Sequence, residues 1–158
     1  MLSFWGTVWG NILMTFLISM VPVIELRGAI PAAVFAGLDI RVALIVAIVG
    51  NLVPVPFIIV FIRKIFKWLR QKSRWLGDMV RRMEEKANAK KAQVLRYEFW
   101  GLLLLVAIPL PGTGAWTGAL VAAMLDMQLK RAFPAIAAGV VTAGLIVTIA
   151  TYGVSVLI

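Results

Sequence analysis

Two stretches of the chain are predominantly apolar over enough residues to cross a lipid bilayer. They cover residues 42–62 and 132–152. Because a helix rises about 1.5 Å per residue, each stretch spans roughly 30 Å, the thickness of the hydrocarbon core of a bilayer. The pattern therefore predicts two transmembrane helices.

Basic residues mark one end of each predicted span. The first span is followed by RKIFKWLRQK, the second is preceded by Lys130 and Arg131, and 12 of the 16 basic residues lie between Arg63 and Arg96. Clustered Lys and Arg beside an apolar span are typical of the cytoplasmic side. We therefore expect a multi-pass protein of the plasma membrane with a cytoplasmic segment at residues 63–96. The first span then runs inward and the second runs outward.

The stretch before each span is also apolar, but Pro and Gly break it halfway. These stretches cover residues 9–38 and 97–125. Proline removes a helical hydrogen bond, and irregular backbone at membrane depth must be buried by protein or reached by water. Each stretch therefore predicts a re-entrant helical hairpin, with both ends on one side of the membrane. We expect the first to enter from outside and the second from the cytoplasm.

The two halves of the chain also share a spacing. Pro22 lies 17 residues before Asp39, and Pro109 lies 17 residues before Asp126, so the halves are offset by 87 residues. Inverted repeats with discontinuous helices are typical of secondary transporters. The predicted fold is an all-α integral membrane protein built as an inverted repeat of re-entrant helical hairpin plus transmembrane helix. The predicted units are one membrane domain at 1–158, with repeats at 9–62 and 97–153.

The segment between the repeats is charged and lacks a spanning stretch. Its apolar residues follow helical spacing at Leu76, Met79, Val80, Met83 and Ala87. This spacing predicts an amphipathic helix. We interpret it as a solvated connector lying on the membrane, and the alternative is a cytoplasmic lever or a contact for anionic lipids.

Composition narrows the chemistry. The chain is 62% hydrophobic, against roughly 45–50% for a soluble domain. It contains no cysteine and no histidine, which excludes disulfides, thiolate metal sites and the usual acid–base side chain at neutral pH. We therefore expect no enzymatic activity, no cofactor and no metal site. The net charge of +9 also fits a nucleic-acid patch, but the hydropathy favours a membrane protein without a nucleic-acid partner.

Glu25 and Arg27 lie at the predicted tip of the first hairpin. A charged side chain near the bilayer centre costs about 2.5–3.5 kcal/mol on insertion scales, so it normally faces a partner, a cavity or water. The functional hypothesis is that Arg27 binds an anion, while Glu25 positions the side chain of Arg27 and exchanges a proton. The alternative is a local pair that neutralises itself and pins the hairpin.

The predicted tip of the second hairpin reads IPLPGTGAWTGA and carries no charge. If a helix restarts after Gly114, its first N–H groups and positive dipole end favour an anionic group. Arg27 would add a bidentate donor. The alternative is that the glycines only let helices pack closely.

Asn51 interrupts the first span. It is a candidate for the wall of a substrate cavity. A single asparagine is also an ordinary hydrogen-bonding residue between membrane helices, so this alternative stays open.

The motifs E-x-R-G-A-I-P and P-L-P-G-T-G-A-W-T-G-A resemble those of the small multidrug export protein family. That family is similar to the DedA and VTT membrane proteins, whose fold pairs two inverted re-entrant hairpins with transmembrane helices. The resemblance implies substrate-binding residues in both motifs. In the first motif they are Glu25, Arg27, Gly28 and Pro31, and in the second they are Pro109, Pro111, Gly112, Thr113, Gly114, Trp116, Thr117 and Gly118.

The resemblance implies two substrate classes. The family name implies drug export, whereas the DedA and VTT relatives imply movement of phosphate-bearing lipids. The leading hypothesis is a transporter or flippase for an anionic lipid, a polyprenyl phosphate or a phospholipid, with a site between the hairpin tips and coupling to protons. One alternative is proton antiport of cationic drugs, and another is a membrane scaffold or assembly factor.

The small number of spans also bears on assembly. Two spans and two short hairpins leave much irregular backbone to shield from lipid. We therefore expect a homodimer surrounded by membrane lipids.

Overall fold

The computed structural model describes residues 7–72, 74–75, 77–78, 81–82, 85, 97–110 and 113–157. All regular secondary structure in this part of the chain is helical. The helices are α1 (Val8–Met20), α2 (Glu25–Phe35), α3 (Ile40–Leu52), α4 (Pro54–Lys72), α7 (Glu98–Ala107), α8 (Ala115–Met124) and α9 (Leu129–Leu157).

Two of these helical segments are long and apolar enough to cross a membrane. They are Ile40–Ile62, with 23 residues, and Leu129–Val154, with 26 residues. The predicted spans 42–62 and 132–152 lie inside them. The first passes from α3 into α4 with one interruption, at Val53. Because proline has no N–H and suits the first position of a helix, Pro54 explains this interruption.

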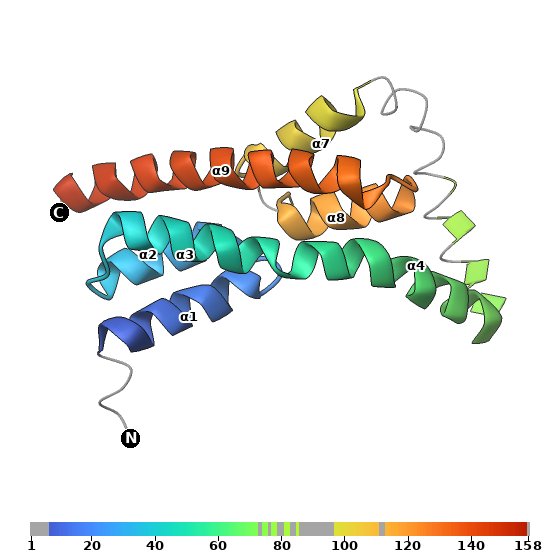
Figure 1. Ribbon diagram of the computed structural model, residues 1–158, viewed down its shortest axis with the longest axis horizontal. Helices are drawn as coiled ribbons and strands as arrows, with labels where there is room; N and C mark the ends of the chain where they lie inside the picture. Colours follow the sequence, from blue (N-terminus) through green and yellow to red (C-terminus); the bar gives the residue numbers. More distant parts are fainter. Residues whose placement is uncertain are drawn as a thin grey trace.

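Each half of the molecule begins with a helical hairpin (Figure 1). In the first, α1 runs toward the middle of the molecule, and α2 returns toward the end where α1 began. In the second, α7 and α8 do the same from the opposite end. The two tips therefore meet near the middle, while α3–α4 and α9 run along the length of the molecule.

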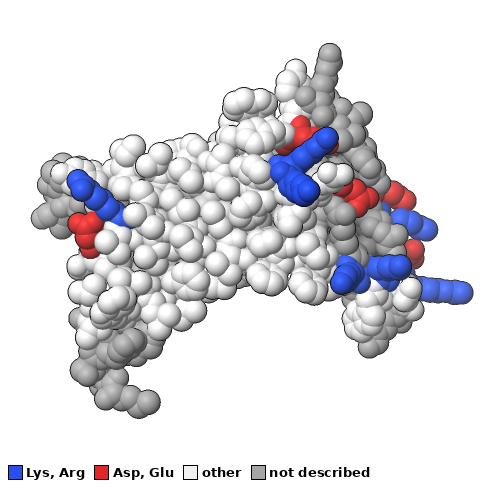
Figure 2. Space-filling model, viewed as in Figure 1, with Lys and Arg blue, Asp and Glu red and all other residues white. Residues whose placement is uncertain are grey.

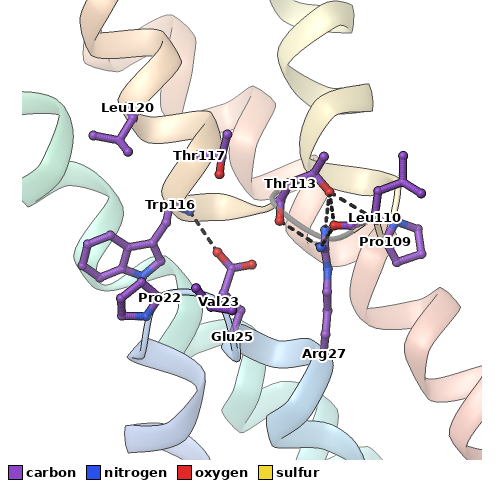
Figure 3. Close-up of a pocket in the computed structure, with 10 residues that line it drawn as sticks. All are labelled: Pro22, Val23, Glu25, Arg27, Pro109, Leu110, Thr113, Trp116, Thr117 and Leu120. Atoms are coloured by element: carbon purple, nitrogen blue, oxygen red, sulfur yellow. Dashed lines mark hydrogen bonds between the residues drawn. The ribbon is translucent and has the colours of Figure 1, made fainter. Parts of the chain in front are cut away.

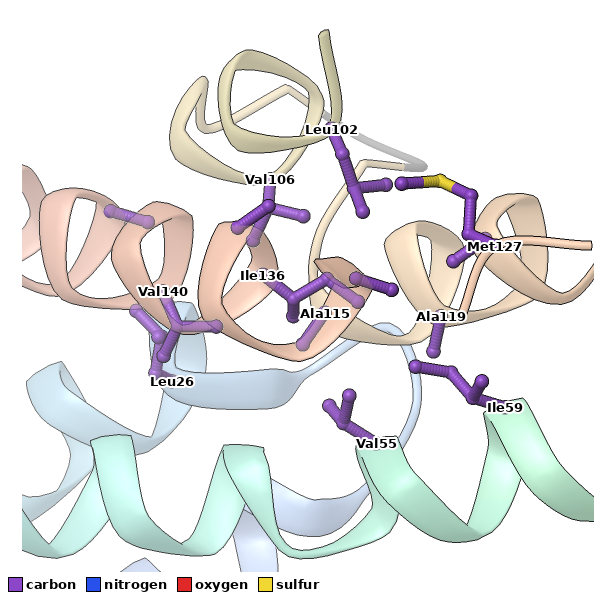
Figure 4. Close-up of a cluster of buried hydrophobic side chains, with 14 of the residues drawn as sticks. Leu26, Val55, Ile59, Leu102, Val106, Ala115, Ala119, Met127, Ile136 and Val140 are labelled. Atoms are coloured by element: carbon purple, nitrogen blue, oxygen red, sulfur yellow. The ribbon is translucent and has the colours of Figure 1, made fainter. Parts of the chain in front are cut away.

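Each short returning helix packs against the long helix of the other half. Helix α2 contacts α9, and α8 contacts α4. The side chains between them are apolar and fully buried, among them Leu26, Val55, Ile136 and Val140 (Figure 4). Burial of a large aliphatic side chain contributes about 1.5–3 kcal/mol in water. The halves are thus interleaved rather than stacked side by side.

Small residues let α7 and α9 approach closely. A Cβ atom added at Gly139 of α9 would lie 2.7 Å from the Cβ of Val106 and 2.8 Å from the carbonyl oxygen of Leu103. Side chains essentially never come so close. Close approach of this kind is how small residues strengthen helix contacts in membranes, where apolar side chains gain little by leaving lipid.

The surface divides into charged ends and an apolar middle (Figure 2). In this view Lys, Arg, Asp and Glu gather at the two ends of the long axis, and the surface between them shows none. Large apolar side chains such as Phe35, Ile45 and Ile149 are exposed. A water-soluble monomer rarely exposes so much contiguous apolar surface, whereas a lipid bilayer accommodates it.

Helix α4 extends beyond the predicted span. It continues from position 62 to Lys72 and carries the sequence RKIFKWLRQK. Further on, Arg81 forms exposed ion pairs with Asp78 at 3.3 Å and with Glu85 at 3.7 Å. The apolar positions of the predicted amphipathic helix, Leu76, Met79, Val80, Met83 and Ala87, lie outside the described residues.

Candidate functional site

Glu25 reaches from the first hairpin to the start of α8 (Figure 3). Its side chain is 4% exposed, and its Oε1 accepts a hydrogen bond from the backbone N–H of Trp116 at 3.2 Å. The backbone N–H of Ala115 also donates to this carboxylate. The first N–H groups of a helix have no partner within the helix, and the positive dipole end favours an anion. Glu25 therefore caps α8.

Arg27 reaches from the same helix to the end of α7. Its Nη1 donates to the carbonyl oxygens of Leu110 at 2.6 Å and Thr113 at 2.8 Å. Its Nη2 donates to those of Ile108 at 3.1 Å and Val106 at 3.4 Å, and to Oγ1 of Thr113 at 3.0 Å. The last carbonyls of a helix lack partners within it, and the negative dipole end favours a cation. Arg27 therefore caps the end of α7 and the loop that follows.

The two charged side chains thus cap the two sides of the break between α7 and α8. Arg27 caps the end of α7 and the following loop, and Glu25 caps the start of α8. Figure 3 shows the Glu25 carboxylate directed to Trp116 and the Arg27 guanidinium directed to Thr113 and Leu110. The ion pairs found among the described residues do not join Glu25 to Arg27. Trp116 and Thr113, which hydrogen-bond these two side chains, lie in the other hairpin, and the two charges also act on each other electrostatically.

Gly114 provides the close approach that this arrangement needs. Its φ is 141°, a conformation that L side chains rarely adopt, and an added Cβ would overlap the Glu25 carboxylate. Glycine is therefore required here for two independent reasons.

Trp116 forms a further link between the hairpins. Its indole Nε1 donates to the carbonyl oxygen of Met20 at 3.1 Å. Met20 is the last residue of α1, so this carbonyl also lacks a partner in its own helix. The second hairpin thus caps the first, as the first caps the second.

A cavity of about 360 Å³ lies between the tips. We call it the tip cavity. Its wall is mostly apolar, with one carboxylate, one guanidinium and two hydroxyl groups. It is lined by Pro22, Val23, Glu25, Arg27, Pro109, Leu110, Thr113, Trp116, Thr117 and Leu120 (Figure 3).

A second cavity of about 360 Å³ follows α9, and we call it the α9 groove. Arg27 and Pro109 line both cavities. The remaining wall of the groove is almost wholly apolar. It consists of Pro31, Phe35, Ile146, Val147, Ala150, Thr151 and Val154.

The structure brings together six of the residues predicted from the two motifs. Glu25, Arg27, Pro109, Thr113, Trp116 and Thr117 line the tip cavity. Gly118 instead packs against Val106, and Gly28 packs against Ile24 in the preceding turn. Gly114 lies beside Glu25 without lining the tip cavity, and Pro31 lines the α9 groove. Pro111 and Gly112 lie outside the described residues.

Asn51 does not line the tip cavity. It is 1% exposed, and its side chain hydrogen-bonds the Glu25 carboxylate from behind. Asn51 therefore contacts Glu25, which lines the tip cavity, and does not line the cavity itself.

Four residues of the tip cavity were not predicted as site residues: Pro22, Val23, Leu110 and Leu120. Pro22 was visible in the sequence as the helix break. Val23 has a φ of 78°, which a β-branched residue rarely adopts. A valine at this position therefore did not predict the turn. Leu110 and Leu120 are ordinary apolar residues whose place in the wall follows only from how the hairpins meet.

The described residues contain no group of three or more side chains that could hold a metal ion.

Comparison with known proteins gives one match. No curated protein and no solved structure matches the chain. A family model described as "Putative small multi-drug export protein" matches residues 25–146. The match includes Glu25 and Arg27, the second hairpin tip, the first apolar span and most of the second, and it covers well over half of the chain. The chain belongs to this small multi-drug export protein family.

Proposed function

We propose that this protein is a membrane exporter that binds lipophilic cations in the tip cavity and couples their movement to protons through Glu25. The observation that carries the proposal is one buried carboxylate on a wall that is otherwise mostly apolar and includes an indole ring. Such a wall suits an amphipathic cation, which gains from the apolar surface, the aromatic face and the carboxylate. All terminal N–H groups of Arg27 already have acceptors nearby, so its charge is largely committed to the protein.

The proposed transport cycle uses two inverted re-entrant hairpins. The opposed directions of the hairpins and the meeting of their tips near the middle support it. In transporters with inverted repeats, one repeat rocks against the other around a midplane site. The hydrogen bonds of Glu25 and Arg27 across the tips are then the contacts that change when the halves move.

The topology of this proposal can be tested with introduced cysteines, because the chain has none of its own. We expect a cysteine at Asp39 to react with an impermeant thiol reagent in intact cells. A cysteine at Gln128 should react only after permeabilisation. Ser3 lies outside the described residues, and a cysteine there should react from outside. Reaction at Ser3 only in permeabilised cells would contradict the first hairpin.

Transport is tested with the purified protein in liposomes and ethidium as the cation. We expect an opposed proton gradient to drive ethidium accumulation. Glu25→Gln keeps the shape of the side chain but cannot carry a proton, so it should lower the driven accumulation at least tenfold. Arg41→Gln is the matched control, because Arg41 is exposed at the start of α3. Full proton-driven accumulation by Glu25→Gln would overturn the proposal.

A second candidate function is movement of an anionic, phosphate-bearing lipid, such as a phospholipid or a polyprenyl phosphate. One observation favours it: Nε of Arg27 is buried without an acceptor, beside the apolar α9 groove, which suits an acyl chain. The same liposomes with a fluorescent phosphatidylglycerol analogue distinguish the candidates. Lipid movement that Arg27→Ala abolishes and Glu25→Gln preserves would support the lipid candidate over the cation exporter.

A scaffold or assembly factor is the third alternative. It predicts that the tips tolerate conservative substitution. Arg27→Lys keeps the charge and loses the planar fork of donors, so a folded Arg27→Lys protein with normal cellular activity but no transport in liposomes would favour the scaffold.

We also propose a homodimer without enzymatic activity. Crosslinking in native membranes that yields only monomer would contradict the dimer. A search for altered lipids after incubation with the purified protein tests for enzymatic activity.

A further inference from the structure

Asn51 carries a polar atom whose burial needs an explanation. Its side chain is 1% exposed, and its amide hydrogen-bonds the Glu25 carboxylate. Its Oδ1 is buried and has no hydrogen-bond partner. An unsatisfied buried acceptor costs about 1–3 kcal/mol. An apolar residue of similar size would avoid this cost, so Oδ1 is expected to have a partner in another state of the protein.

The space around Asn51 excludes most partners. A small internal cavity is lined by Glu25, Arg27, Asn51, Gly114 and Ala115 together with apolar residues of α2, α7 and α9. None of its volume can hold a water molecule. A hydrated cation is larger still. A proton carried by Glu25 needs no additional volume.

Glu25 stands between this internal cavity and the tip cavity, because it lines both. A proton can therefore reach it from the tip cavity while Asn51 contacts it from the other side. The charged group that acts on Glu25 is Arg27, on the same helix. Of the described helices packed nearby, α1 and α8 have no charged residue. Arg41 of α3, Glu98 of α7, and Lys130 and Arg131 of α9 lie in the first turns of their helices.

We propose that Asn51 and Glu25 form a proton-binding pair in which the amide of Asn51 serves both states of the carboxyl group. Toward the ionised carboxylate, Asn51 donates through Nδ2. When Glu25 takes up one proton from the tip cavity, the amide rotates by half a turn, the N–H···O bond breaks, and the new O–H of Glu25 donates to Oδ1. The backbone N–H groups of Ala115 and Trp116 continue to donate to the carboxyl group. Asn51 is thus a positioning residue for the proton, and this role rests on the proposed proton coupling.

Infrared difference spectra between low and high pH test the pair in reconstituted protein. The neutral Glu25 carboxyl gives a C=O stretching band, which Glu25→Gln removes. In Asn51→Leu the O–H loses its acceptor, so we expect this band to move to higher frequency. A purely packing role for Asn51 predicts no such movement. An unmoved band in a folded Asn51→Leu protein would overturn the proposal.

A second measurement needs no variant at Asn51. With ¹³C-labelled asparagine, the wild-type difference spectrum should contain a change in the amide C=O band, and Glu25→Gln should remove it. No amide change would overturn the proposal, and so would a change driven by sodium at fixed pH but not by protons. Failure of ethidium transport with both infrared results intact would reject the exporter and leave the proton pair. Proton-driven transport without the infrared changes would reject the Asn51–Glu25 proton pair and leave the exporter.

Discussion

The two hairpin tips solve the same problem with different chemistry. The tip of the first hairpin carries Glu25 and Arg27, whereas the described part of the second tip carries no charge and offers backbone N–H and C=O groups. Alone, the first would place two charges in an apolar layer, and the second would leave the ends of two helices unsatisfied. Together each supplies what the other lacks. The costly features of one membrane hairpin can thus be paired with those of another across a tertiary contact.

The hairpins also differ in how tightly they fold. Helix α1 ends at Met20 and α7 ends at Ala107, whereas α2 begins at Glu25 and α8 begins at Ala115. The second break is therefore longer than the first. Three of the four carbonyl oxygens that accept from Arg27 belong to described residues of this break, namely Ile108, Leu110 and Thr113, and the fourth belongs to Val106 in α7.

The largest effect should come from removing the close approach at the second tip. In Gly114→Ala, the new Cβ meets the Glu25 carboxylate and the backbone must hold a φ that alanine disfavours. Such a conformation alone costs about 1–3 kcal/mol, and displacement of Glu25 adds to it, so we expect a loss above about 3 kcal/mol. Denaturant unfolding in detergent measures this change.

Gly101→Ala is the matched control for Gly114→Ala. Gly101 lies in α7, and an added Cβ there meets nothing within 4 Å. Alanine in a helix interior is favoured over glycine by about 0.5–1 kcal/mol, so this variant should be as stable as the wild type or slightly more stable. Equal stability of Gly114→Ala and Gly101→Ala would refute the account of the second tip.

The next largest loss of stability should come from removing the guanidinium of Arg27 at the first tip. Arg27→Ala removes the charged donor to the carbonyl oxygens of Leu110 and Thr113 in the loop after α7, and hydrogen bonds to charged groups contribute about 1.5–3 kcal/mol. We expect unfolding to become easier by about 2–3 kcal/mol, with Arg27→Lys intermediate because an ammonium cannot span the same oxygens. Arg41→Gln should change stability little. If Arg27→Ala matched Arg41→Gln in an unfolding experiment, the capping role would be wrong.

The smallest loss of stability should come from removing the hydrogen bond that the second hairpin donates to the first, from Trp116 to Met20. Trp116→Phe keeps an aromatic ring but removes the N–H that bonds the carbonyl of Met20. One neutral hydrogen bond contributes about 0.5–1.5 kcal/mol, so we expect a loss of about 1 kcal/mol. A loss as large as that of Arg27→Ala would mean that the indole ring, rather than its N–H, holds the two tips together.

The sequence predicted the coarse architecture because its signals are local. Length and hydropathy located the two apolar spans, and proline and glycine located both helix breaks. The cost of a charge among apolar residues singled out Glu25 and Arg27. The re-entrant placement of the hairpins in a membrane and the inverted repeat stay predictions.

The partners of each charge could not be read from local pattern. Two charges two residues apart suit a local pair equally well, and only the contact between hairpins directs Glu25 to α8 and Arg27 to α7. The depth of Asn51 was hidden for the same reason, because its place behind Glu25 depends on how α3 packs against α2.

The caps across the tips also bear on the order of events during synthesis. Arg27 and Thr113 are 86 residues apart in the chain, and Glu25 and Trp116 are 91 apart. At about 5–20 residues per second, a ribosome takes roughly 4–18 s to add that much chain. For that interval the first hairpin exists without the groups that cap its charges. Since unpartnered charges are costly in lipid, Glu25 and Arg27 must keep contact with water or with the insertion machinery until the second hairpin emerges.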